Sequence, residues 1–275
     1  DEKLGASCTG PFVATGFEPM AEVQMEKYAG YWGGEPKLDT VDLKIIDDQD
    51  ALNMALQNGE IDLVAQMPAV GTQLFAGDDN FVMDSVTSTR TSFLMYNLNT
   101  PALQDVNVRN ALSMRIDREG FAGVIFNGFA EPSYGVYSSA LTYGGTEGLM
   151  LAVDSFDPEG AAQLLTEAGY EDTDGDGIRD KDGENLSLTF VTYSYNTEFL
   201  QFADMYQAQL AEIGVDLQIE TYDILDSTME AGAFDIAGLN YAMAPTGNEN
   251  YFVNMVFVPG ASNNYNGYDN ARVTE

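Results

Sequence analysis

The sequence of 275 residues contains no histidine and a single cysteine, Cys8. Without histidine, nucleophilic sites of the Ser-His and Cys-His kinds are excluded, as are zinc sites of the common Cys/His kind. Direct binding of Ni²⁺ through imidazole is disfavoured for the same reason, although a chelated nickel complex needs no such ligand. A single cysteine forms no internal disulfide, so cysteine usage leaves the redox compartment open.

Positive charge is scarce in this chain. Eleven Lys+Arg residues stand against 44 Asp+Glu residues, which gives a net charge of −33, and the acids are spread over the whole length. Such a surface repels nucleic acid and anionic lipid headgroups, so we expect neither as a partner. It suits either the steering of cationic solutes or solubility in a salty or extracellular medium.

Long apolar runs are missing as well. No segment reaches the roughly 18 consecutive apolar residues that a membrane-spanning helix needs. The first residues, Asp1-Glu2-Lys3, precede no apolar signal-peptide core, so we expect any leader to have been removed by processing or trimming. The 45% of hydrophobic residues, with 15 Tyr and 15 Phe, are ample for a folded core.

Hydrophobic periodicity predicts that strands and helices alternate along the chain. A capping aspartate followed by proline, Asp157-Pro158, predicts a helix start, and Gly169 predicts its end. The expected strands are 11–17, 23–28, 41–46, 61–65, 93–97, 186–193, 215–221 and 234–239, and the expected helices are 49–57, 106–116, 118–126, 158–168, 199–213 and 224–231. Alternation at these lengths predicts an α/β fold.

Several segments carry a family resemblance. Residues 28–39 read YAGYWGGEPKLD, residues 55–62 read ALQNGEID, residues 105–118 read DVNVRNALSMRIDR and residues 156–170 read FDPEGAAQLLTEAGY. In this order they resemble the family 5 extracellular solute-binding proteins, which serve peptide and nickel ABC transporters.

The resemblance implies a periplasmic-binding-protein-like fold of the class II, or cluster C, type. On this basis we expect an internal fragment: residues 1–60 are the end of lobe I, 61–265 are most of lobe II, and 266–275 begin the return to lobe I. It also implies the substrate-binding component of an ABC importer, closing two lobes over an extracellular solute. The expected location is extracytoplasmic, periplasmic or as a cell-surface lipoprotein whose lipid anchor lies outside this chain, and the expected partners are ABC permease subunits.

The resemblance also places candidate ligand contacts after the strand expected at 234–239. These are Asn240, Tyr241 and Met243, with Tyr96, Asn97, Tyr134 and Tyr137 as further candidates. Peptide-binding relatives have an aspartate for the peptide's α-amino group where this chain has Ala244, and Glu249 or Asp235 could substitute for it. The ligand is therefore expected to be peptide-like, with an oligosaccharide or a chelated metal as the alternatives.

Two other functional classes stay open. A receptor that passes a bound peptide signal to a sensor would share the same scaffold. A carboxylate-pair glycosidase is formally possible, but with 44 acids any pairing of carboxylates in the sequence carries no information. We expect no catalysis.

One acidic loop has the pattern of a cation site. Residues 172–184 read DTDGDGIRDKDGE, and against a calcium loop of the EF-hand type the acids and glycine at positions one, three, five, six and nine match. Position twelve falls on Gly183 instead of an acid. The candidate ligands of a structural Ca²⁺ are Asp172, Asp174, Asp176, Asp180, Asp182 and Glu184; the alternative is a metal-free loop of Asx turns. No other cofactor is expected.

Overall fold

The computed structural model describes residues 8–141 and 155–274. The chain divides into two compact units, Asp1–Phe81 and Val82–Glu275. The boundary between the units thus follows Phe81, whereas the sequence places the passage between lobes after residue 60, and the assignment of residues to lobes stays a prediction. In the described parts of both units, no helix has the length and apolar character needed to cross a membrane.

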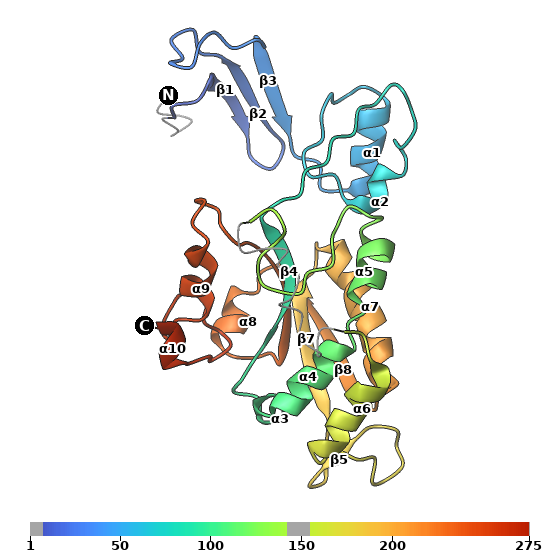
Figure 1. Cartoon of the computed structure of the whole chain (residues 1–275). Helices are drawn as coiled ribbons and strands as arrows, with labels where there is room; N and C mark the ends of the chain where they lie inside the picture. Colours follow the sequence, from blue (N-terminus) through green and yellow to red (C-terminus); the bar gives the residue numbers. More distant parts are fainter. Residues whose placement is uncertain (1–7, 142–154, 275) are drawn as a thin grey trace. The chain divides into compact units, whose positions relative to one another are not determined.

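The first unit is a three-stranded antiparallel sheet followed by two short helices (Figure 1). Its strands are β1 (Phe12–Glu18), β2 (Glu22–Lys27) and β3 (Thr40–Lys44), and its helices are α1 (Gln49–Gln57) and α2 (Ala69–Thr72). Asp48 caps α1 by accepting a hydrogen bond from the Ala51 N–H at 2.8 Å. The strand predicted at 61–65 is wrong, because these residues pair with no other strand of the described chain.

The only tryptophan, Trp32, lies in the turn between β2 and β3 and is 81% exposed. Its indole N–H donates to the Thr9 carbonyl at 3.2 Å, and its ring contacts Tyr31 at a centroid distance of 5.3 Å. Trp32 therefore connects the segment before β1 to this turn.

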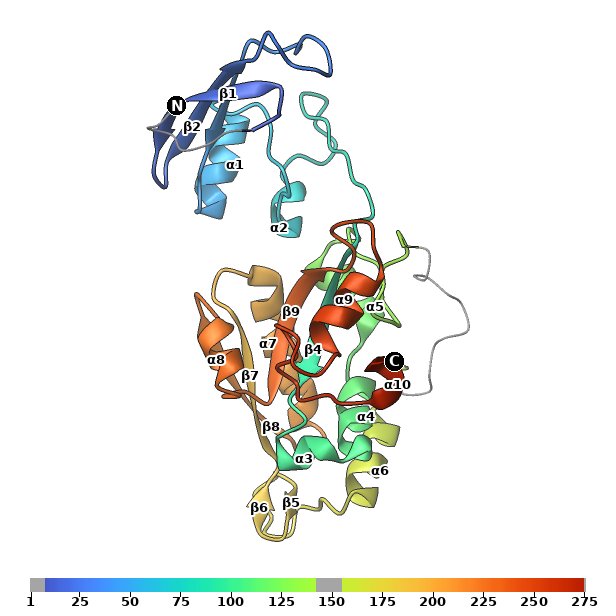
Figure 2. The ribbon, with the colours of Figure 1, turned by 90° about the vertical axis from the view of Figure 1, so that its left-hand side faces the viewer.

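The second unit is a mixed four-stranded sheet with helices on both faces. The strand order is β4 (Arg90–Tyr96), β9 (Ile236–Ala242), β7 (Ser187–Tyr193) and β8 (Asp216–Tyr222), so β9 lies between β4 and β7 although it is last in the sequence (Figure 2). Strand β7 is parallel to both β8 and β9, and β4 is antiparallel to β9. The helices are α3 (Pro101–Gln104), α4 (Val106–Met114), α5 (Arg118–Ile125), α6 (Pro158–Glu167), α7 (Thr197–Ala211), α8 (Asp226–Glu230), α9 (Asn250–Val256) and α10 (Ala271–Thr274), and a small hairpin joins β5 (Asp180–Lys181) to β6 (Glu184–Asn185).

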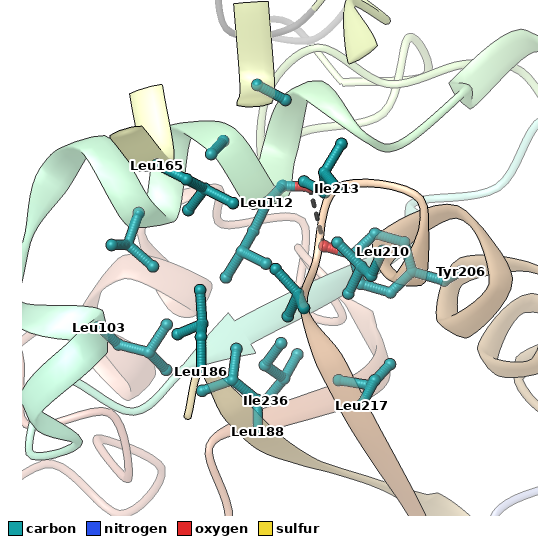
Figure 3. Close-up of a cluster of buried hydrophobic side chains, with 14 of the residues drawn as sticks. Leu103, Leu112, Leu165, Leu186, Leu188, Tyr206, Leu210, Ile213, Leu217 and Ile236 are labelled. Carbon is teal, nitrogen blue, oxygen red and sulfur yellow. Dashed lines mark hydrogen bonds between the residues drawn. The ribbon is translucent and has the colours of Figure 1, made fainter. Parts of the chain in front are cut away.

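Each face of this sheet has its own apolar core. Figure 1 shows the helices that cover the two faces. On one face, α4, α6 and α7 bury a leucine-rich cluster against Leu188 and Phe190 of β7 (Figure 3). On the other face, α8 and α9 pack over Val191 of the same strand. Burying one such side chain fully stabilises the fold by about 1.5–3 kcal/mol, so the two cores fix the sheet and the loops at its edges.

The helix boundaries follow the signals in the sequence. Asp157 accepts a hydrogen bond from the Gly160 N–H at 2.9 Å, Pro158 is the first helical residue of α6, and Gly169 follows the helix with a φ of +87°. A left-handed residue at this position suits glycine, which has no Cβ to clash. The prediction of this helix is confirmed, as is the predicted α/β class.

Candidate functional site

The parallel strands β7, β8 and β9 all end at one edge of the sheet of the second unit. Strand β7 continues into α7 on one face, whereas β9 continues toward α9 on the other face. In open α/β sheets, ligands bind outside the carboxyl ends of the strands, where successive connections leave toward opposite faces. This edge is therefore where the topology favours a ligand.

Tyrosines gather at this edge. Tyr193 and Tyr222 are the last residues of β7 and β8, Tyr241 is next to last in β9, and all of them point to the face covered by α8 and α9 because they pack against its core. The Tyr195 ring contacts the Tyr193 ring in a tilted arrangement, with centroids 5.2 Å apart and an interplanar angle of 31°. Tyr265 completes the group, and we call Tyr193, Tyr195, Tyr222, Tyr241 and Tyr265 the tyrosine edge.

Aromatic packing supports the Tyr241 ring of the tyrosine edge. Phe93 of β4 meets Tyr241 edge-on with centroids 5.3 Å apart, and Phe252 of α9 meets Phe93 in the same way at 5.4 Å. The Asn263 side-chain amide donates to the Tyr241 phenolic oxygen at 3.2 Å. These contacts fix the ring of Tyr241, since edge-to-face pairs of this kind contribute about 0.5–1.5 kcal/mol beyond the area they bury.

Within the tyrosine edge, the phenols of Tyr193, Tyr241 and Tyr265 are neutral at physiological pH. Burial, followed by the neighbouring phenols Tyr241 and Tyr195 and the Asp226 carboxylate, raises the pKa of Tyr193 to about 12. Burial also raises the pKa of Tyr241 and of Tyr265 above the usual value. A neutral phenol both donates and accepts hydrogen bonds, so this edge can bind polar uncharged groups and stack against apolar ones.

The three ligand contacts predicted in and just after β9 have different surroundings. Tyr241 belongs to it, but Asn240 points to the opposite face, where its amide binds Arg90 at 3.2 Å and Ser92 at 2.8 Å. Met243 is fully buried in the core beneath α8 and α9. Of the three, Tyr241 is the one that the structure brings to the tyrosine edge.

Tyr96 and Asn97 lie at the far end of β4, away from the tyrosine edge, because Tyr96 pairs with Ile236 and Thr91 pairs with Tyr241. Asn97 donates to the carbonyls of Phe234 and Gly232 at 2.9 and 3.3 Å and accepts from the Asn99 N–H at 3.0 Å. Its amide is thus used in joining β4 to the start of β9. Burial raises the pKa of Tyr96 to about 12.

Tyr134 and Tyr137 come from the loop after α5. The Tyr137 hydroxyl donates to the Glu249 carbonyl at 2.6 Å, and its ring packs on the same core as the tyrosine edge. Tyr134 is 37% exposed and lies under the Arg118 guanidinium, 5.9 Å from the ring centroid. Tyr137 is therefore a support of the α9 region, while Tyr134 presents an exposed ring.

Asp235 and Glu249, the two residues that could replace the aspartate absent at position 244, lie apart from each other. Ala244 itself is buried. Asp235 stands at the opposite edge, where its carboxylate accepts from the Thr100 hydroxyl at 2.6 Å and from the Thr189 N–H at 2.7 Å. Asp235 therefore joins strands and does not face the tyrosine edge. Glu249 precedes α9, and its carbonyl accepts the Tyr137 hydroxyl.

Sequence reasoning missed Tyr193, Tyr195, Tyr222 and Tyr265. Each of the first three lies at or just after the end of an expected strand, and that position is a usable signal once the strands are known to be parallel. The sequence order does not reveal that β9 inserts beside β7, which is what brings Tyr193 and Tyr241 together.

The acidic loop leads into the β5–β6 hairpin of the second unit. Carboxylate oxygens of Asp172, Asp174 and Asp176, all exposed, lie within 4.8 Å of one another. Asp172 accepts from the N–H groups of Gly175 and Gly177 at 2.8 and 3.2 Å. Carboxylates bonded in this way close a loop as Asx turns and still have free lone pairs for a cation.

The other predicted metal ligands have different positions. Asp180 is buried and accepts from the Thr173 N–H and hydroxyl, and the first of these bonds is the main cause that lowers the pKa of Asp180. Asp182 lies in the hairpin turn with a φ of +55°, and Glu184 is the first residue of β6. The structure therefore brings together the first three acids of the predicted set.

Comparison with known proteins identifies the family. A family model described as the middle part of the bacterial extracellular solute-binding proteins, family 5, matches residues 1–264. The chain belongs to family 5 of the bacterial extracellular solute-binding proteins. The family resemblance inferred from the sequence motifs is thereby confirmed.

The two curated relatives described next match 97% and 77% of this chain. The nickel-binding protein NikA of Staphylococcus aureus is 24% identical over 97% of the chain and 52% of NikA. The oligopeptide-binding protein AppA of Bacillus subtilis is 29% identical over 77% of the chain and 39% of AppA. The AppA structure in complex with a nonapeptide superimposes with a TM-score of 0.80 at 27% identity, over 96% of this chain and 53% of that one. The chain therefore spans about half the length of these family 5 proteins or less.

Proposed function

We propose that this chain is part of the substrate-binding component of an ABC importer, which captures an extracellular, peptide-like solute. The tyrosine edge is the observation that supports this function. Its rings offer apolar surfaces for side chains, and its neutral hydroxyls can donate to the carbonyl groups of a peptide. Its position outside the carboxyl ends of β7, β8 and β9 fits a ligand that enters from solvent.

The similar proteins support the same class of ligand. AppA of Bacillus subtilis is an oligopeptide-binding protein, and its solved structure holds a nonapeptide. Family 5 proteins are solute-binding proteins and not enzymes, so capture and release is the activity that we propose. The partners are ABC permease subunits, and the location is extracytoplasmic, either periplasmic or at the cell surface as a lipoprotein.

Native mass spectrometry of the full-length protein, purified without refolding, tests this proposal. We expect a co-purified solute with the mass of a peptide, or binding from an equimolar pool of dipeptides to pentapeptides. Tyr241→Ala should abolish that binding, whereas Tyr251→Ala, which removes a half-exposed ring of α9 outside the tyrosine edge, should retain it. Failure to bind any peptide in the pool would contradict the proposal.

An oligosaccharide is the second candidate ligand. Tyr195 is 70% exposed and its ring is tilted by 31° against that of Tyr193, and exposed rings of this kind can stack on sugar faces. A matching pool of cello- and xylo-oligosaccharides in the same experiment separates the two ligands. A chelated nickel complex, added as a third probe, tests the remaining alternative.

A further inference from the structure

Asp226 lies at the carboxyl edge of the sheet, at the start of α8. Strand β8 ends at Tyr222 on this edge, and α8 begins at Asp226 after a short connection. Leu225 and Met229, on either side of Asp226 in the sequence, are buried in the same core that supports Tyr193 and Tyr241. The helix is therefore anchored against the tyrosine edge, while Asp226 itself is exposed.

The Asp226 carboxylate acts on several phenols at once. Its charge raises the pKa values of Tyr193, Tyr241 and Tyr265, in each case in addition to the larger effect of burial. These three residues come from β7, β9 and the segment before α10, and all three pack on the core that contains Leu225 and Met229, so the start of α8 lies beside tyrosines from separate parts of the second unit. The tyrosine edge thus has a negative charge beside its rings.

In the part of the chain that the structure describes, Asp226 forms no ion pair with a cation. Among the described residues the ion pairs are those of Lys27 with Glu35 and Asp39 and of Arg115 with Glu212, and none includes Asp226. Arg90 lies on the opposite face of the sheet, bound to Asn240. The connection before α8 is separately fixed, because the Ser194 hydroxyl donates to Asp223 at 2.5 Å.

We propose that Asp226 and the rings of Tyr193, Tyr241 and Tyr265 bind a positively charged organic group of the ligand, an alkylammonium or a guanidinium. Aromatic faces attract such cations through their quadrupoles, and a carboxylate adds a charge-assisted contact. The proposal rests on the proposed function, because it assigns a charge to the solute that the same edge captures.

A pair of isosteric probes isolates the effect of charge. Choline carries a quaternary ammonium, and 3,3-dimethyl-1-butanol has the same shape without the charge. Binding of each to the full-length protein is measured by tyrosine fluorescence and by nuclear magnetic resonance line broadening. We expect choline to bind at least about tenfold more tightly than the alcohol, since cation–π and charge-assisted contacts together exceed the difference in hydration.

Substitutions then assign the preference to the named residues. Asp226→Asn should reduce the preference for choline to within about threefold, while Asp204→Asn, which removes an exposed acid of α7, should leave it unchanged. Tyr193→Phe retains the ring and should retain the preference, whereas Tyr193→Leu should lose most of it. Circular dichroism confirms that each variant is folded.

Two outcomes overturn the inference. Equal binding of choline and its neutral isostere would do so, and so would an unchanged preference in the Asp226→Asn protein. If a peptide or sugar co-purifies with the protein in either case, the proposed function stands and only the assignment of a charged group to Asp226 fails. If no solute binds in any experiment, both fail together.

Discussion

The phenolic O–H of Tyr206 donates a hydrogen bond of 2.8 Å to the backbone carbonyl of Leu112, which joins α7 to α4 inside the core (Figure 3). Tyr206 is fully buried, and so is the side chain of Leu112. Because the two residues are 94 positions apart, this bond ties segments that no local signal connects. It stabilises the face of the sheet opposite the tyrosine edge.

Removing this hydroxyl gives the first prediction. Tyr206→Phe keeps the ring but removes the donor, and we expect the free energy of unfolding to fall by about 1–2 kcal/mol, since a buried bond is lost. Urea denaturation followed by circular dichroism measures the change. Tyr251→Phe, at a half-exposed ring, is the matched control and should have no effect beyond about 0.5 kcal/mol. Equal stability of the two variants would contradict the role given to the bond.

Local signals in the sequence predicted much of this fold because they act over a few residues. The Asp157-Pro158 helix start depends on one side chain and the nearest N–H groups, and the structure has that bond. Alternation predicted β8 and the end of β7 within one or two residues. The strand predicted at 61–65 failed because a short apolar run does not show whether a partner strand exists.

The candidate site was harder to predict because it depends on distant residues meeting. Asn97 has the character of a ligand contact in the sequence, yet its amide binds carbonyls of Gly232 and Phe234, some 135 residues later. Tyr193 was not predicted as a ligand contact, because its place beside Tyr241 follows from the insertion of β9 between β4 and β7. Local secondary-structure propensity does not determine the order of the strands in a sheet.

The charge of −33 gives a prediction about salt. Carboxylates repel one another across the folded surface, and salt near 1 M shortens the screening length to about 3 Å. We therefore expect the melting temperature of the full-length protein to rise by several degrees between dilute buffer and about 1 M NaCl. KCl should have the same effect, and sucrose at equal osmolality a smaller one. A melting temperature independent of NaCl would refute this account.

The acidic loop gives a prediction about its own turns. Asp172→Ala leaves the N–H groups of Gly175 and Gly177 without their acceptor, so we expect a melting temperature lower by about 2–4 °C in EDTA. Asp204→Ala, in an exposed helix position, is the control for loss of charge. Differential scanning calorimetry measures both.

Calcium separates the two interpretations of this loop. Millimolar Ca²⁺ should raise the melting temperature of the wild type, but not of an Asp172→Asn, Asp174→Asn double variant, if the three neighbouring carboxylates hold the ion. No shift in the wild type would reject the metal and leave the loop as a set of Asx turns. Magnesium at equal concentration controls for general screening of the acids.

Tyr193 gives a prediction about alkaline pH. Burial raises the pKa of Tyr193 to about 12, above the ordinary tyrosine value of 10.0, so the folded protein retains a proton that the unfolded chain loses. Its contribution to stability is complete below pH 10 and disappears as the pH rises through 12. Tyr193→Phe cannot ionise, so between these pH values its stability should fall less steeply than that of the wild type. Ultraviolet titration of phenolate at 295 nm should show one late-ionising group fewer in this variant, and an unchanged late phase would contradict the position given to Tyr193.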